Sequence, residues 1–197
     1  MFFGYKMQIN KKKYFINLGC SHAASYQMPV EQSYPFLLAN MLDLGYKDYA
    51  YSRTSLEYSE YALNSSHYSE SEFVLWQLTY PWRKHNWNAV NRQDARIDFK
   101  VTNTMNEYYE DISLKGSFKI YANLLQKYKS DNIFFFFIDQ SYLIPCINDL
   151  CKLNNKLYPK NINFIDKGYD SIHGGPKTQQ LIADSLFEFI KNYDKKN

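Results

Sequence analysis

The segment Ile-Phe-Phe-Phe-Phe-Ile at residues 133–138 constrains the fold of this chain more than any other. An uninterrupted apolar run of this length is typical of a strand that is buried on both faces. Such strands belong to parallel sheets that carry helices on each side, because polar residues alternate with apolar ones wherever one face of a sheet meets water. The run therefore predicts a central strand of a helix-covered sheet.

Strand-like and helix-like segments alternate along the rest of the chain. We predict strands near 14–18, 46–51, 72–79, 133–138 and 162–165, and helices near 33–44, 54–64, 104–129, 145–153 and from about 176 onward. This order predicts an α/β protein with a mainly parallel five-stranded sheet and helices on both faces. Residues 1–197 are expected to form a single domain. An irregular insert at about 80–103 lacks clear periodicity, and stretches of that length are usually functional or mobile.

The predicted helix at 33–44 has recognisable boundaries. Ser33 is expected to cap its N-terminus, Pro35 suits its first turn, and Gly45 is expected to stop it. Its apolar residues are expected to share one buried face, and these are Phe36, Leu37, Met41 and Leu44. The longer helix predicted at 104–129 contains Gly116, where a break is possible.

Charge and cysteine content exclude several classes of protein. The net charge is only +3 and the one basic cluster is Lys11–Lys13, so no nucleic-acid partner is expected. Three cysteines do not make a disulfide framework, and no histidine and cysteine set has the spacing of a zinc site. No segment approaches the roughly 20 apolar residues of a membrane span, and the N-terminus lacks a signal-peptide core. We expect a cytoplasmic protein with no metal and no membrane partner.

Two short motifs at opposite ends of the chain carry candidate chemistry. Ser21 follows the first predicted strand in the sequence Gly-Cys-Ser-His, and Asp170 and His173 form an Asp-x-x-His motif before the last helix. In open α/β sheets, ligands bind beyond the carboxyl ends of the strands, where these motifs, Ser52 and Thr79 are expected to lie. A serine needs an adjacent base, so His173 would take its proton and Asp170 would fix the histidine tautomer. The pair of motifs predicts a Ser-His-Asp hydrolase.

Each of these residues also has a purely structural interpretation. Ser21 can be a turn residue at a strand end, and His173 can be a structural loop histidine. Cys20 is better interpreted as a small buried apolar residue than as a nucleophile. His22 either lines the site or caps the turn. Arg83 either binds substrate or a developing oxyanion, or is solvated or ion-paired.

With these residues in place, the chain resembles the SGNH (GDSL-like) hydrolases. Within them it resembles a divergent, phage-type group whose first block is Gly-Cys-Ser followed by His or Phe. The resemblance is carried by residues 15–22, 31–39 and 170–176. It implies a flavodoxin-like three-layer α/β/α sandwich, with Ser21 as the nucleophile and Asp170 and His173 as its partners. It also implies that no cofactor is needed.

The sequence departs from the family pattern in all three of its oxyanion-related blocks. Cys20 stands where the family usually has Asp. The second block, at residues 50–55, lacks the usual Gly, so the backbone N–H of Ser52 or Arg53 would have to serve. The third block lacks the usual Asn, and the available substitutes are Gln77, Thr79 and Arg83. Loss of one oxyanion donor can lower the rate by roughly 10²–10³.

The resemblance leads to one expected function and two alternatives. We expect hydrolysis of a carboxylic ester, an O-acetylated carbohydrate or a small acyl ester, through an acyl-enzyme on Ser21. The backbone amides of Ser21 and Ser52 are expected to stabilise the oxyanion. One alternative is a non-catalytic binding or virion-associated protein that kept the SGNH fold. The other is an acyltransferase that passes the acyl group to a hydroxyl acceptor.

Overall fold

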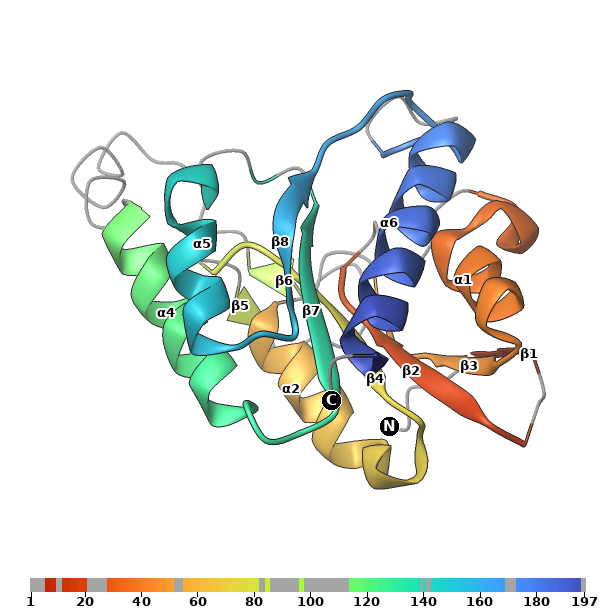
Figure 1. Cartoon of the computed structure of the whole chain (residues 1–197), viewed down its shortest axis with the longest axis horizontal. Coiled ribbons are helices and arrows are strands. Elements are labelled where there is room, and N and C mark those ends of the chain that lie inside the picture. Colours follow the sequence, from red (N-terminus) through yellow and green to blue (C-terminus); the bar gives the residue numbers. More distant parts are fainter. Residues whose placement is uncertain are drawn as a thin grey trace.

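The computed structural model has a central sheet with helices on both faces (Figure 1). It describes residues 6–9, 12–20, 28–51, 55–81, 84–85, 96–97, 114–138, 140, 143–168 and 173–195. In this part of the chain, no helix has the length and apolar character needed to cross a bilayer.

Six strands form the sheet, in the order β1-β3-β2-β4-β7-β8. Their bounds are β1 Lys6–Ile9, β2 Tyr14–Leu18, β3 Gly45–Asp48, β4 Val74–Leu78, β7 Ile133–Ile138 and β8 Leu157–Ile162. The five strands from β3 to β8 in this order are parallel, which confirms the predicted parallel five-stranded sheet. The sequence did not reveal β1, which pairs antiparallel with β3 at one edge. Two further short strands, β5 (Lys84–His85) and β6 (Arg96–Ile97), pair inside the predicted insert.

The helices divide between the two faces of the sheet (Figure 1). Their bounds are α1 Tyr34–Leu42, α2 Leu56–Ser65, α4 Leu114–Lys127, α5 Ile144–Leu153 and α6 Pro176–Asp194, with short 3-10 turns η1 at Val30–Gln32 and η2 at Tyr68–Glu70. Helices α2, α4 and α5 pack on one face, and α1 and α6 lie side by side on the other. The result is a three-layer α/β/α arrangement.

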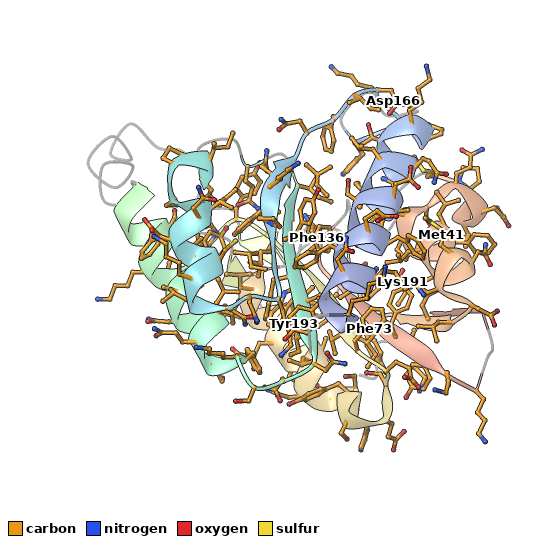
Figure 2. The ribbon with its side chains drawn as sticks, in the orientation of Figure 1. Met41, Phe73, Phe136, Asp166, Lys191 and Tyr193 are labelled. Carbon is orange, nitrogen blue, oxygen red and sulfur yellow. The ribbon has the colours of Figure 1, made fainter. Side chains whose placement is uncertain are left out.

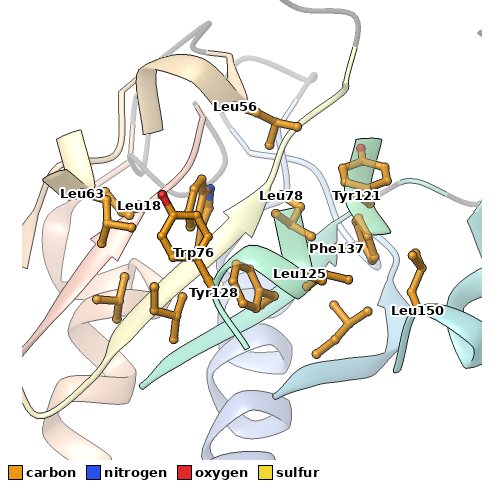
Figure 3. Close-up of a cluster of buried hydrophobic side chains, with 14 of the residues drawn as sticks. Leu18, Leu56, Leu63, Trp76, Leu78, Tyr121, Leu125, Tyr128, Phe137 and Leu150 are labelled. Carbon is orange, nitrogen blue, oxygen red and sulfur yellow. The ribbon is translucent and has the colours of Figure 1, made fainter. Parts of the chain in front are cut away.

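The apolar residues of β7 belong to both hydrophobic clusters, one on each face of the sheet. Ile133, Phe135 and Phe137 join the cluster under α2, α4 and α5, where Figure 3 shows Phe137 with Trp76 and Tyr128. The alternate residues of the strand, which include Phe134 and Phe136, join the cluster under α1 and α6. The whole strand is buried, as its composition predicts. Successive side chains of a strand point to opposite faces, so β7 contributes to both clusters.

The structure resolves the position of the last strand and the question of a break at Gly116. The last strand is β8 at Leu157–Ile162, not 162–165. It is an edge strand with exposed polar positions and a proline, so it lacks the apolar pattern that marks a buried strand. Helix α4 continues through Gly116 without a break, since a single glycine lowers helix stability by only about 1 kcal/mol.

Helix α1 differs from its prediction at its C-terminus and on its buried face. Asp43, with φ 56°, is the left-handed residue that ends the helix, and Gly45 already belongs to β3. The buried residues of the helix are Tyr34, Pro35, Leu38 and Ala39. Met41, which was expected to be buried, is 36% exposed. The helix packs against both the sheet and α6, so its buried face is set by two neighbours at once.

Candidate active site

The segments that lead into Ser21 and Ser52 are hydrogen-bonded to each other at the carboxyl edge of the sheet. Strands β2 and β3 are parallel neighbours, and their pairing continues past the last strand residues. The Tyr49 N–H donates to the Asn17 carbonyl at 2.9 Å, and the Tyr51 N–H donates to the Gly19 carbonyl at 3.0 Å. Gly19 adopts φ 147°, a conformation that favours glycine, so the turn after β2 depends on this residue.

Cys20, the residue before Ser21, is held by a glutamine on the neighbouring strand β4. Its backbone N–H donates to Gln77 Oε1 at 3.2 Å, and its thiol donates to the same oxygen at 3.3 Å. Both residues are buried. A thiol and a carboxamide oxygen form a neutral pair in a site with little access to water. The two contacts attach Cys20 to β4 through its backbone and its side chain.

A second polar cluster ties the carboxyl ends of β4, β7 and β8 together. Gln140 Nε2 donates to the Leu78 carbonyl at 2.6 Å, and the Gln140 N–H donates to Asn161 Oδ1 at 2.8 Å. The Tyr121 hydroxyl lies 2.9 Å from both Gln140 Oε1 and the carbonyl of buried Thr79. These contacts link the carboxyl ends of three neighbouring strands to one another and to α4.

The loop that carries His173 is fastened to the start of α6 through Asp166 (Figure 2). Asp166 Oδ1 accepts hydrogen bonds from the Thr178 N–H at 2.7 Å and the Thr178 hydroxyl at 2.6 Å, and Oδ2 accepts one from the Lys177 N–H at 3.0 Å. Burial raises the pKa of Asp166, but these hydrogen bonds outweigh burial, and the pKa lies below its usual value. The His173 carbonyl accepts from the Gly168 N–H at 2.7 Å, and Gly174 forms a bridge with Lys167.

The two glycines after His173 permit a close approach of this loop to α6. A Cβ atom on Gly174 would lie 2.5 Å from Thr178 Cγ2. A Cβ atom on Gly175 would lie 2.6 Å from Asp166 Oδ2 and from the Lys167 carbonyl oxygen. Side chains do not tolerate such contacts, so the position of His173 depends on glycine at both places.

Three of the predicted site residues belong to the described part of the chain, and these are His173, Gln77 and Thr79. The others, Ser21, His22, Ser52, Arg53, Arg83 and Asp170, lie outside the described residues. Gln77 lies in β4, Thr79 directly follows the last residue of that strand, and His173 is half-buried in the loop before α6.

Sequence reasoning missed the polar residues that support this edge. Gln140 and Tyr121 follow no motif, because their partners, backbone carbonyls and side chains alike, lie far away in the sequence. Asn17 did offer a signal, since it is a polar residue in an otherwise apolar strand and is completely buried. Such a residue must have hydrogen-bond partners inside the fold.

Comparisons with known proteins support the fold. No protein-family model matches the sequence, and no curated protein matches it. Among solved structures, the psychrotrophic esterase EstA from Pseudoalteromonas sp. is similar with a TM-score of 0.56 and 17% identity, covering 93% of this chain and 99% of that one. A lipolytic protein of the G-D-S-L family from Desulfitobacterium hafniense has a TM-score of 0.57 and 9% identity, with coverages of 90% and 99%.

A carbohydrate esterase, whose active site "displays divergent catalytic and non-catalytic binding functions", has a TM-score of 0.55 and 15% identity. It is matched over 93% of this chain and 70% of its own. At such low identities the likeness concerns the fold. The chain has the α/β fold of the SGNH (GDSL) esterases, as its short motifs predict. The phage-type subgroup stays a prediction.

Proposed function

We propose that this protein is a serine ester hydrolase in which Ser21 is the nucleophile and His173 is the general base. The Ser21 oxygen would attack the ester carbonyl carbon while His173 takes the hydroxyl proton. Collapse of the tetrahedral intermediate would break the bond to the alcohol, which leaves with that proton. Water would then attack the acyl-enzyme with His173 again as base, releasing the carboxylic acid and restoring Ser21. Asp170 would hold the histidine ring in the required tautomer.

The observation that carries this proposal is the location of the two motif neighbourhoods in a fold shared with esterases. Gly19 and Cys20 follow strand β2 at the carboxyl edge of the sheet, and His173 lies three residues before the start of α6 at Pro176. That edge is where open α/β sheets bind ligands. The support comes from the segment that leads into Ser21 and from the His173 loop next to α6, and the roles of Ser21 and Asp170 are part of the proposal.

Backbone amides are the proposed oxyanion donors. The hydrogen bond from the Tyr51 N–H to the Gly19 carbonyl ties together the segments that lead into Ser21 and Ser52. An amide N–H of Ser21 or Ser52 does not depend on the side chain, so the missing Gly of the second block does not abolish it. Arg53, Arg83 and His22 are proposed as further substrate or oxyanion contacts.

The proposed substrate class is an O-acetylated carbohydrate or a small acyl ester. It is supported by structural neighbours that are named esterases, one of them a carbohydrate esterase. That carbohydrate esterase is also named for non-catalytic binding, and this favours a second candidate. A binding protein that lost turnover would fit the absence of the family's usual oxyanion Gly and Asn.

Active-site labelling separates these candidates. The wild type, Ser21→Ala and His173→Ala are incubated with a fluorophosphonate probe, and p-nitrophenyl acetate hydrolysis is followed in parallel. Ser71→Ala and His67→Asn serve as controls, since the Ser71 hydroxyl donates to the nearby Tyr68 carbonyl at 2.7 Å and Asn tolerates the φ of 51° at His67.

The proposal expects labelling and turnover in the wild type and both controls, with loss in both Ser21→Ala and His173→Ala. A folded wild type that neither labels nor turns over would contradict it and support the binding protein. Addition of an alcohol tests the third possibility. Formation of its ester in preference to free acid would identify an acyltransferase.

A further inference from the structure

Four polar side chains form a hydrogen-bonded network near the carboxyl ends of β2 and β3. They are Asn17 of β2, Asp48 of β3, Tyr34 of α1 and Gln179 of α6, and we refer to them as the buried network. Asn17 and Tyr34 are 0% exposed and Gln179 is 3% exposed, while Asp48 is half-buried. Each of the four comes from a different element, so their contacts fix how those elements sit together.

The first connection joins β2 to the chain that follows β3. Asp48 Oδ1 accepts a hydrogen bond from Asn17 Nδ2 at 2.9 Å and another from the Ala50 N–H at 3.0 Å. The second bond shapes the backbone two residues before Ser52. The Asp48 carboxylate thus links the strand that leads to Ser21 with the segment that leads to Ser52.

The second connection runs from β2 through α1 to α6. The Tyr34 hydroxyl donates to Asn17 Oδ1 at 2.8 Å, and the Tyr34 N–H donates to Gln179 Oε1 at 2.9 Å. The second of these bonds crosses the contact between α1 and α6, which lie side by side in Figure 1. Burial, together with the negative charge of Asp48, raises the pKa of Tyr34 well above its usual value, so its hydroxyl remains a donor.

The third connection reaches the loop that carries His173. Gln179 Nε2 lies 3.5 Å from the carbonyl oxygen of Gly174, the residue after His173. This distance is long for a hydrogen bond. The backbone N–H of Gln179 donates to the Gly175 carbonyl at 3.0 Å. Gln179 therefore contacts both glycines that permit the close approach of the loop.

The chemistry of the network gives it one preferred arrangement. The Asp48 carboxylate only accepts hydrogen bonds, so Asn17 must turn its amide nitrogen toward it and its oxygen toward Tyr34. When a buried hydrogen bond is broken, water cannot reach the group that has lost its partner. The free energy of unfolding then falls by about 1–3 kcal/mol. Apolar side chains of equal size could fill the same space, but they would not fix which atoms of neighbouring elements face each other.

We propose that the buried network positions the His173 loop and the segment that leads into Ser52 relative to the end of β2 that leads into Ser21, with Tyr34 and Gln179 as positioning residues. This inference rests on the proposed hydrolase function. Neither residue would touch substrate, and both would act through the backbone that they hold.

The test uses two variants and two matched controls. Gln179→Met removes both polar atoms of Gln179 at nearly constant length, and Tyr34→Phe removes a single hydroxyl. Gln180→Met changes the next residue of α6, an exposed side chain that donates to Asp184. Tyr128→Phe removes a hydroxyl that donates to Glu60 on the other face of the sheet.

Two measurements separate positioning from folding. The first is the NMR resonance of the His173 Cε1–H group and its pH titration, assigned by its loss in His173→Ala, which needs no activity. The second is the rate of fluorophosphonate labelling, with kcat and KM for p-nitrophenyl acetate. Both are made at a temperature where urea denaturation shows every variant to be folded.

We expect Gln179→Met and Tyr34→Phe to shift the His173 resonance and its titration midpoint. We also expect them to slow labelling and lower kcat on the order of 10-fold to 10²-fold, with little change in KM. The controls should match the wild type in both measurements. If Gln179→Met does not fold, Tyr34→Phe alone decides the outcome.

Folded variants whose His173 resonance and labelling rate equal those of the controls would overturn the inference. A wild type that does not label, combined with a shifted His173 resonance in the variants, would refute the hydrolase function but leave the positioning role standing. The two failures are therefore distinguishable.

Discussion

Gln77 Oε1 accepts hydrogen bonds from both the backbone N–H and the thiol of Cys20, at 3.2 and 3.3 Å. One carboxamide oxygen on β4 thus holds the residue that precedes the proposed nucleophile. The two residues are 57 positions apart in the sequence. Cys20 supplies two hydrogen-bond donors, and Gln77 Oε1 is the acceptor for both.

This pairing predicts that the usual family residue is unfavourable here. Cys20→Asp would place a carboxylate against the Gln77 oxygen in a buried site, and a buried unpaired charge costs more than a neutral polar group, which costs about 1–3 kcal/mol. Cys20→Ser keeps a donor, with O–H in place of S–H, and should cost less. Urea denaturation measures both free energies of unfolding. Equal stability of Cys20→Asp and wild type would show that Gln77 turns freely to accommodate a charge.

Gly174→Ala tests the close approach of the His173 loop to α6. The added Cβ would lie 2.5 Å from Thr178 Cγ2, and such overpacking typically costs about 1–3 kcal/mol. We expect lower stability and slower fluorophosphonate labelling, because the loop must move. Thr178→Ser removes Cγ2 but keeps the hydroxyl that bonds Asp166. The double variant should recover part of both losses, and no recovery would place the strain elsewhere.

Asp166→Asn tests the charge that caps the start of α6. The pKa of Asp166 is below its usual value in the folded protein, so its carboxylate stabilises the fold above the unfolded-state pKa. That stabilisation is lost as pH falls through the folded-state pKa. We expect Asp166→Asn to cost about 0.3–1 kcal/mol at pH 7, because it removes the negative charge at the start of the helix and one of the two acceptor oxygens. The difference from wild type should shrink below about pH 4. Urea denaturation at several pH values measures it, and a constant difference would exclude a role for the charge.

Tyr121→Phe tests the cluster at the ends of β4 and β7. It removes the hydroxyl that lies 2.9 Å from the Thr79 carbonyl and from Gln140 Oε1. A hydrogen bond of this kind contributes about 0.5–1.5 kcal/mol, so the free energy of unfolding should fall by that amount. Tyr121 is completely buried, and Phe preserves its ring contact with Phe137. An unchanged midpoint in urea would mean that other donors replace the hydroxyl.

Local pattern was a good guide where a residue's environment depends on its own neighbours. The apolar runs at 14–18 and 133–138 coincide with β2 and β7, and the final helix begins at Pro176 as predicted. The pattern failed at β8, an edge strand with exposed positions. It also failed on the buried face of α1, where α6 covers residues that the sequence alone would leave exposed.

The sequence by itself determined the class of fold and the two motif neighbourhoods of the candidate site. It did so because strand and helix periodicity, and glycines such as Gly19 and Gly174, are local properties of the chain. Only the tertiary structure decided which polar groups meet. Tyr34 and Gln179 are 145 positions apart, and their contact exists because α1 and α6 pack on the same face of the sheet. A polar side chain has several possible partners in a sequence, and the packing of distant elements selects one.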